Sequence, residues 1–177
     1  AKHQSFFDVI MIVSAVEKPK FIMKHSLKYA PVLGWFGLRI GCICVERGKR
    51  AQAIKSMVAE VKSGKAPAGQ LIIYPQGTRI SPGVSAPYKI GTAALYQETG
   101  QICVPAATNV GVFWPKYGIL RQPGLAVVEF LPAIQPGFDN EEFMHRLEAR
   151  IEQSSNALLE EAAADRFYPL ARDTRDT

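Results

Sequence analysis

Short apolar runs that are typical of β-strands alternate with helical patterns along this chain, and this alternation limits the fold more than any other feature. The strand-like runs are Pro19–Lys24, Cys42–Arg47, Gln70–Pro75, a run beginning at Gln101, and Leu125–Pro132. Strands separated by helices favour parallel pairing, because each parallel pair needs a crossover connection. The sequence therefore predicts an α/β fold, a single domain whose central sheet is largely parallel or mixed and is flanked by helices.

Helical signals separate these runs. Ser5 and Asp8 precede an apolar run at a spacing that predicts a helix start, with the Ser5 hydroxyl capping the first turn. A broken helix is predicted at His25–Ile40, where Pro31, Gly34 and Gly37 interrupt the pattern. Further helices are predicted at Arg50–Lys65, Tyr88–Gly100 and Asp139–Ala164. The last of these is expected to be a long, charged surface helix. No repeat or low-complexity linker divides the 177 residues, so one domain over residues 1–165 and a polar tail over 166–177 are expected.

The charge balance predicts an anionic partner. The net charge is +5 and the calculated pI is near 9.2. Basic side chains stand singly beside glycine, proline and apolar residues, and no block rich in lysine and arginine is present. This distribution favours a small phosphate-bearing ligand over nucleic acid.

Cysteine content and the length of the apolar runs indicate the cellular environment in which the protein is expected to work. The three cysteines, Cys42, Cys44 and Cys103, have no spacing typical of a disulfide framework or a zinc site, so a reducing cytoplasmic environment fits best. No apolar stretch reaches the roughly 20 residues that a membrane-spanning helix needs. Because the sequence begins with Ala1 and not with methionine, we expect a fragment that lacks an N-terminal membrane-anchoring segment.

His3 and Asp8, five residues apart, are the candidate catalytic pair. On one continuous helix or strand this spacing points the two side chains away from each other, so they meet only if the chain turns between them. The helix start predicted at Ser5 supplies that turn. Asp8 would then accept a hydrogen bond from one imidazole nitrogen and leave the other as a proton acceptor. The alternative is that Asp8 only completes the cap and His3 is a surface residue.

Polar and basic residues lie at or near the ends of the first four predicted strands, where α/β sheets bind their ligands. Lys24 follows the first strand, Arg47 ends the second, Pro75–Arg79 follows the third, and Pro105–Asn109 lies in the run that begins at Gln101. In the third loop a glycine allows close backbone approach, a threonine offers a hydroxyl, and an arginine offers a forked cation suited to phosphate. No P-loop, dinucleotide-binding glycine motif or metal-ligand cluster is present.

Taken in order, these segments resemble the four motifs of the glycerolipid acyltransferase family. His3–Asp8 is similar to its H-x-x-x-x-D motif, and Gly41–Arg47 to its second motif, which ends in an acidic residue and arginine. Tyr74–Ser81 resembles the third, commonly F-P-E-G-T-R-S, and Cys103–Asn109 the fourth. The resemblance covers roughly Ala1 to Trp114, and the ordered set is far more specific than any single motif.

The third motif departs from the family pattern at two positions. Gln76 stands where the family usually has glutamate, which keeps the hydrogen-bonding shape but removes the negative charge. Ile80 separates Arg79 from Ser81, where the family often has serine directly after arginine. Gln76 can therefore serve any role at this position that needs only hydrogen bonds, but none that needs a carboxylate.

The resemblance implies transfer of a fatty acyl group from a thioester, on coenzyme A or acyl carrier protein, to the free hydroxyl of lysophosphatidate, giving phosphatidate in phospholipid biosynthesis. A thioester is already activated, so no cofactor and no enzyme-bound nucleophile are needed. His3 would be the general base, and Asp8 would fix its tautomer and stabilise the imidazolium. The residues expected to bind the acceptor are Gln76, Gly77, Thr78 and Arg79, with Lys24 and Arg47 as further cations.

Both substrates carry lipid chains, so the implied location is the cytoplasmic face of the membrane. The segment Val32–Gly41 carries Trp35 and Phe36 close to Arg39, which is compatible with a patch at the lipid interface. The alternative for this segment is a helix packed in the core.

Two rival functions are compatible with these features. A thioesterase or lipid hydrolase could use the His3–Asp8 pair to activate water, although no G-x-S-x-G nucleophile motif is present. A non-catalytic module that binds anionic membranes would explain the basic pI without a role for His3. The ratio of acyl transfer to fatty-acid release separates the first rival from the transferase, and substitution of His3 separates the second.

Overall fold

The computed structural model describes residues 1–39, 42–45, 55, 58–59, 63, 69–117 and 119–167. The helix predicted at Arg50–Lys65 and the polar tail predicted at 166–177 lie largely outside these residues. The division into a domain over 1–165 and a tail therefore stays a prediction.

A three-stranded parallel sheet occupies one end of the molecule. Its order is β2-β1-β3, with β1 at Pro19–Lys24, β2 at Ile43–Val45 and β3 at Gln70–Ile72. The carboxyl-terminal half of β1 pairs with β2 and its amino-terminal half with β3, so β1 extends beyond the end of β3. The strand at Pro19–Lys24 is confirmed over its full length, whereas β3 stops three residues before Pro75.

A second sheet pairs β4, at Ala106–Thr108, with β5, at Val128–Phe130, in antiparallel fashion. Between them the chain forms the short helix α5, at Val110–Phe113, and then a long loop. The mixed α/β class is confirmed, but the described strands form two small sheets where one central sheet was expected. An antiparallel return needs no crossover helix, so the alternation of strands and helices fails to predict the pairing after Thr108.

Helix boundaries follow the local signals closely. Helix α1 spans Phe7–Ala15, and the broken helix after β1 consists of the 3-10 helix η1 at His25–Tyr29 and α2 at Leu33–Arg39. Helix α4 spans Gly91–Thr99 and ends at Gly100, which adopts the left-handed conformation that favours glycine (φ 59°). The predicted break in the second helix and the predicted stop of α4 are both confirmed.

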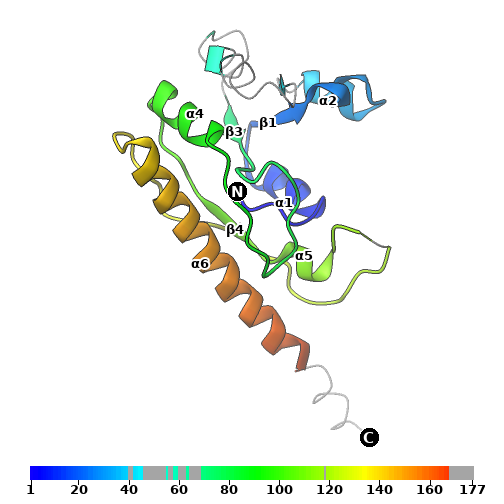
Figure 1. Cartoon of the computed structure of the whole chain (residues 1–177). Helices are drawn as coiled ribbons and strands as arrows, with labels where there is room; N and C mark the ends of the chain where they lie inside the picture. The colour runs from blue at the N-terminus through cyan, green and yellow to red at the C-terminus, as the bar shows by residue number, and fades with distance from the viewer. Residues whose placement is uncertain are drawn as a thin grey trace, which may run out of the picture.

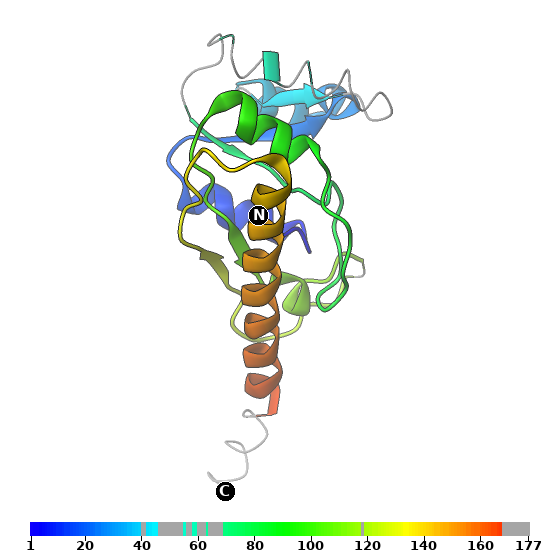
Figure 2. The ribbon, with the colours of Figure 1, turned by 60° about the vertical axis from the view of Figure 1, so that its left-hand side comes forward.

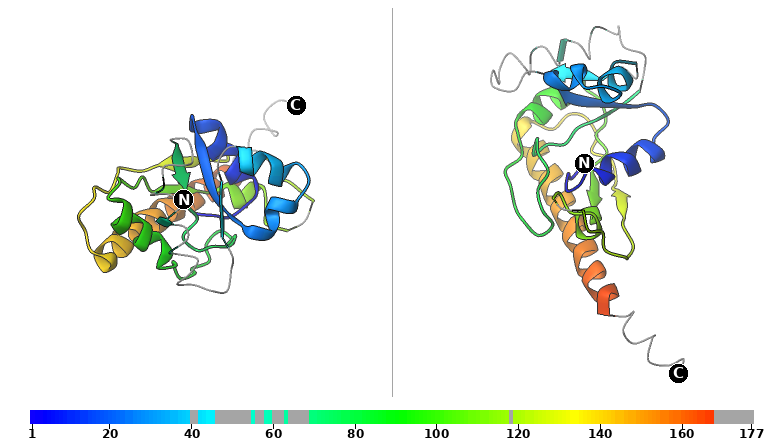
Figure 3. Two further views of the ribbon diagram at one scale, coloured as in Figure 1. Left: turned by 90° about the horizontal axis from the view of Figure 1, so that it is seen from above. Right: turned by 90° about the vertical axis from the view of Figure 1, so that its right-hand side faces the viewer.

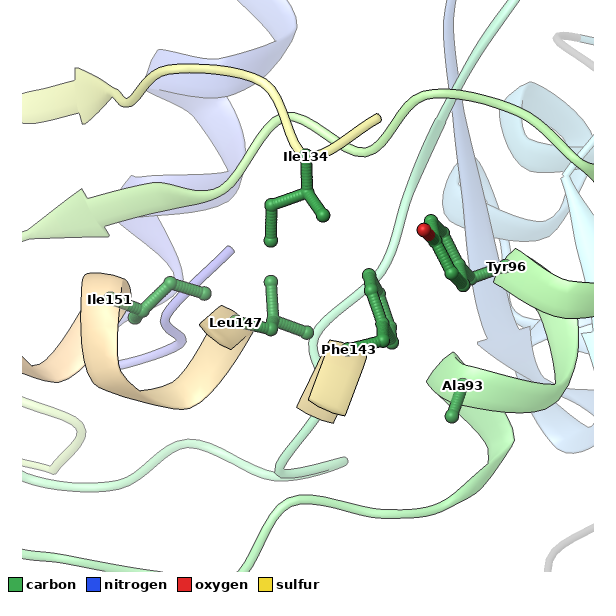
Figure 4. Packing of buried hydrophobic residues seen from close by; sticks show 6 residues of the cluster. All are labelled: Ala93, Tyr96, Ile134, Phe143, Leu147 and Ile151. Atoms are coloured by element: carbon green, nitrogen blue, oxygen red, sulfur yellow. The ribbon is translucent and has the colours of Figure 1, made fainter. Parts of the chain in front are cut away.

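The long helix α6, at Asn140–Phe167, supplies one wall of the core. Its buried residues Phe143, Leu147 and Ile151 recur every four positions and pack against Ala93 and Tyr96 of α4 and against Ile134 (Figure 4). The rings of Tyr96 and Phe143 stack with centroids 3.9 Å apart. The predicted helix is confirmed, but its inner face is part of the core, so it is amphipathic and more than a surface helix.

The amino end of the chain lies in the middle of the molecule, between the two sheets (Figures 1 and 2). The Ala1 nitrogen donates to the Ile73 carbonyl, just after β3, at 2.8 Å. The Lys2 N–H donates to the Ala106 carbonyl of β4 at 2.9 Å. Helix α6 contacts β4, and α1 contacts β5 and α5 from the other side (Figure 3). The first residues therefore connect the sheets and bring His3 to their junction.

Candidate active site

His3 and Asp8 form a hydrogen-bonded pair at this junction. Imidazole Nδ1 lies 2.9 Å from carboxylate Oδ1. The Asp8 side chain is fully buried, whereas the His3 side chain is 17% exposed. An ionised Asp8 accepts the Nδ1 proton, which leaves Nε2 as the nitrogen that can take a proton from a substrate.

The start of α1 holds Asp8 in place. Its second oxygen, Oδ2, accepts the Gln4 N–H at 2.8 Å and the Ser5 N–H at 2.7 Å. A buried carboxylate is tolerated because both of its oxygens are hydrogen-bonded. Ser5 Oγ accepts the Phe7 N–H at 3.2 Å, so the predicted contact of the hydroxyl with the first turn is present. The helix begins at Phe7, with Phe6 at the N-cap position, where Ser5 was predicted to be the cap.

Two contacts with the loop after β3 fix the His3 ring and backbone. The His3 carbonyl accepts the Ile80 N–H at 2.8 Å. The imidazole stacks face to face on the ring of Tyr74, with centroids 4.0 Å apart and planes at 21°. Three separate contacts therefore position His3: a carboxylate at its edge, a ring against its face and a backbone bond. The motif pattern singled out Tyr74 only as part of the third motif.

The residues on either side of His3 reach distant elements. Lys2 Nζ lies 2.6 Å from both carboxylate oxygens of Glu152 on α6, and the Tyr88 hydroxyl donates to the same carboxylate at 2.8 Å. Gln4 Oε1 accepts the Gly111 N–H of α5 at 3.0 Å. Lys2 and Gln4 are both buried. The sequence could not assign these contacts, because the partners stand 107 and 150 positions further along the chain.

The loop after β3 carries most of the predicted acceptor-binding residues. Gly77 has φ +68°, and its N–H donates to the Tyr74 carbonyl at 2.9 Å. This left-handed conformation favours glycine, and a Cβ here would come 2.4 Å from Lys89 Nζ, so any other residue would also displace the lysine. Thr78 is exposed, and Arg79 is partly buried with Nη1 donating to the Lys116 carbonyl at 3.4 Å.

Lys89 is a cation that the motif pattern did not identify. Its ammonium lies against the backbone of Gly77, and its own N–H donates to the Pro75 carbonyl at 2.8 Å. Cations are unfavourable just before a helix, and Lys89 stands two residues before α4. Because the sequence predicts the helix to start at Tyr88, three residues before its observed start, this position carries no signal that could have identified Lys89.

Gln76 is buried, with 3% of its surface exposed. Its Nε2 lies 3.5 Å from the Ala86 carbonyl, and its Oε1 has no hydrogen-bond partner among the described residues. Burial without a charged partner suits the neutral amide of glutamine better than the carboxylate that the family usually has here.

The other predicted positions divide into two groups. Lys24 ends β1 beside Val45 of β2, but its side chain and all of Arg47 lie outside the described residues. In the fourth motif, Pro105 is buried and Asn109 Oδ1 accepts the Val127 N–H at 2.7 Å. This bond gives Asn109 a structural role beside β5. Among the described residues no group of three metal-ligating side chains occurs.

Comparison with known proteins identifies the family. Residues 1–109 match the family model described as Acyltransferase. The chain belongs to this acyltransferase family. The matched residues end at Asn109, the last residue of the fourth predicted motif.

Two relatives of this acyltransferase-family chain are named 1-acyl-sn-glycerol-3-phosphate acyltransferase. The one from Pseudomonas aeruginosa is 29% identical over 134 residues, which cover 76% of this chain and 52% of the relative. The one from Saccharomyces cerevisiae is 32% identical over 140 residues, covering 76% of this chain and 46% of the relative. The chain thus spans about half the length of these relatives.

A solved structure has the same fold. The crystal structure of the 1-acyl-sn-glycerophosphate acyltransferase PlsC from Thermotoga maritima superimposes with a TM-score of 0.73 at 23% sequence identity. The match covers 89% of this chain and 64% of that chain. At this identity the likeness shows a shared fold.

Proposed function

We propose that this protein transfers a fatty acyl group from a thioester to the free hydroxyl of lysophosphatidate, giving phosphatidate. The observation that carries the proposal is the His3–Asp8 pair, in which Nδ1 is engaged by a buried carboxylate and Nε2 is left to accept a proton. The names of the relatives support lysophosphatidate as the acceptor.

The reaction needs one base and one positioned acceptor. His3 Nε2 removes the hydroxyl proton as the acceptor oxygen attacks the thioester carbonyl carbon, and Asp8 stabilises the imidazolium that forms. The carbon–sulfur bond then breaks, and the leaving thiolate takes the proton from His3. A base in this position is typically worth about 10²- to 10⁴-fold in rate. No cofactor is required, and the donor is acyl-coenzyme A or acyl carrier protein.

The loop after β3 is the proposed site for the acceptor's phosphate. The Ile80–His3 backbone bond couples this loop to the base, so a phosphate held by the loop would lie near His3. The proposed contacts come from the backbone of Gly77 and Thr78 and from the guanidinium of Arg79. Gln76 supports the loop from its buried position, and Lys24 and Arg47 are proposed as further cations.

A lipid surface is the proposed location, at the cytoplasmic face of the membrane. On α2, Trp35 and Phe36 are 57% and 56% exposed, while Gly34 and Gly37 face inward. The aromatic residues therefore lie on the surface, and of the two alternatives the helix packed in the core is wrong for these side chains. Arg39 covers the Trp35 ring at 4.8 Å, a pairing suited to the boundary between lipid and water.

A second apolar stripe begins beside the base. Phe6, Ile10 and Val13 are exposed along one side of α1, at the helical spacing of four and three residues. The stripe starts in the turn that contains Asp8, so it would place His3 close to a lipid surface. No helix in the described part of the chain meets the length and apolarity needed to cross a bilayer.

The test is an acyl-transfer assay in mixed micelles with labelled lysophosphatidate, using acyl-coenzyme A and acyl carrier protein as alternative donors. Wild type should form phosphatidate, and His3→Ala should reduce the rate by about 10²- to 10⁴-fold. Fatty-acid release that outruns transfer would overturn the proposal in favour of the hydrolase. Lipid binding without turnover, unchanged in His3→Ala, would favour the non-catalytic module.

A further inference from the structure

Tyr74 contacts the proposed base in a way that the transferase mechanism above does not use. Its ring lies face to face with the His3 imidazole, at 4.0 Å between centroids and 21° between planes. A third ring, Phe21 of β1, lies 6.4 Å from Tyr74 and nearly parallel to it. The three rings are therefore nearly parallel to one another, from the base to the parallel sheet, and only Tyr74 is in close contact with the imidazole.

The face of an aromatic ring attracts cations, most strongly where water is excluded. His3 is neutral before the reaction and becomes an imidazolium when it takes the hydroxyl proton. The stack is therefore worth more in the charged state than in the resting state, and an interaction that strengthens as charge develops accelerates the step.

We propose that Tyr74 is a positioning residue that stabilises the imidazolium form of His3 through the face of its ring. The inference rests on the proposed function for its catalytic consequence, but the ring–imidazolium interaction itself does not. Asp8 binds the edge of the imidazole and Tyr74 covers its face, so the two groups stabilise the same charge from perpendicular directions.

The Tyr74 hydroxyl is a separate feature. It is buried and has no hydrogen-bond partner among the described residues. Burial, with a smaller contribution from the Asp8 charge, raises the pKa of Tyr74 well above its ordinary value of 10. The ring therefore stays neutral wherever His3 titrates, and its face remains a partner for the cation. Tyr74→Phe keeps this face and removes only the hydroxyl.

The sign of the expected pH effect follows from the charge that is stabilised. A partner for the protonated form makes protonation easier, so its loss moves the titration to lower pH. The charged or titratable groups near His3 include Asp8, Arg79, Lys89, the amino group of Ala1, and Lys2, which Glu152 binds. None of these groups is altered in the Tyr74 variants.

The experiment follows the ring signals of the three histidines by NMR against pH in wild type, Tyr74→Phe and Tyr74→Leu. The midpoint for His3 should move to lower pH by about half a unit to one and a half units in Tyr74→Leu and should stay in place in Tyr74→Phe. His25 is the internal control, because it meets Tyr29 edge to face, at 80°, and should not respond. Phe21→Leu, which perturbs the stack but keeps the Tyr74 ring, should leave the His3 midpoint unchanged.

Enzyme kinetics form the second arm. Tyr74→Leu should lower kcat by about 3- to 30-fold, with little change in KM, and should move the acidic limb of kcat/KM to lower pH. An unmoved His3 midpoint in Tyr74→Leu would overturn the inference, as would an equal shift in Tyr74→Phe, which would assign the effect to the hydroxyl. If the midpoint shifts but wild type transfers no acyl group, the proposed function has failed and the ring interaction has not.

Discussion

The two ends of the candidate site are built differently. At the base end, Lys2, Gln4, Ser5 and Asp8 are all buried, and their hydrogen bonds reach β4, α5 and α6. At the acceptor end, Thr78 is exposed and the Arg79 guanidinium has a 3.4 Å contact with a backbone carbonyl. The difference is the one that the proposed acyl transfer would require, because a general base works only in a fixed geometry, whereas a charged headgroup can be held by flexible cations.

This comparison predicts a division of kinetic effects. Changes at the base end should act on kcat, because they alter a group that takes part in the transition state. Changes at the acceptor end should act mainly on KM, because they weaken binding that is similar in the ground state and the transition state. A base-end variant that altered only KM, or an acceptor-end variant that altered only kcat, would contradict this comparison.

The largest effect is expected for Asp8→Asn. The amide keeps the shape of the side chain, but its NH₂ group can donate to Nδ1, which places the imidazole proton on Nε2 and removes the acceptor. We expect kcat to fall by about 10²- to 10⁴-fold with KM little changed, measured by initial rates. Thermal unfolding of the same variant is the control for folding. A kcat within threefold of wild type would remove Asp8 from the mechanism.

A smaller effect is expected for Glu152→Gln, which tests whether α6 supports the base end. The substitution leaves the buried ammonium of Lys2 without its charged partner. The free energy of unfolding should fall by about 1–3 kcal/mol, since Glu152 is partly exposed and the loss is below that of a fully buried pair.

The measurement is chemical denaturation, with Glu160→Gln as the matched control. Glu160 is exposed on the same helix, so its substitution makes the same change in charge and should alter the free energy of unfolding by less than about 0.5 kcal/mol. Equal effects of the two substitutions would show that the Lys2–Glu152 pair contributes nothing specific.

An effect of similar size, but on binding and not on stability, is expected for Arg79→Ala at the acceptor end. Losing one charge-assisted contact to phosphate should raise KM for lysophosphatidate by about 10- to 100-fold and leave kcat within a few-fold. Arg150→Ala is the matched control, because that guanidinium also donates to a backbone carbonyl, Pro132, but on α6. A fall in kcat with unchanged KM would show that Arg79 acts in the transition state and does not simply bind the acceptor.

How much of the site the sequence predicts depends on the distance between partners along the chain. His3 and Asp8 are five residues apart, and the helix-start signal between them predicts the turn that allows them to meet. Gly77 is likewise predicted by its own turn. Lys89, only twelve residues further on, escaped prediction, because its approach to Gly77 depends on how the loop over residues 80–88 folds back.

The sequence by itself predicted the alternation of strands and helices apart from α5, the turn between His3 and Asp8, and the stop of α4 at Gly100. Backbone geometry and side chains within a few residues decide each of these features. Only the tertiary structure decided that the strands divide into two sheets, that Tyr74 covers the His3 ring and that Glu152 neutralises Lys2. The last two contacts join residues 71 and 150 positions apart, and all three features depend on the packing of the whole chain, which no local pattern contains.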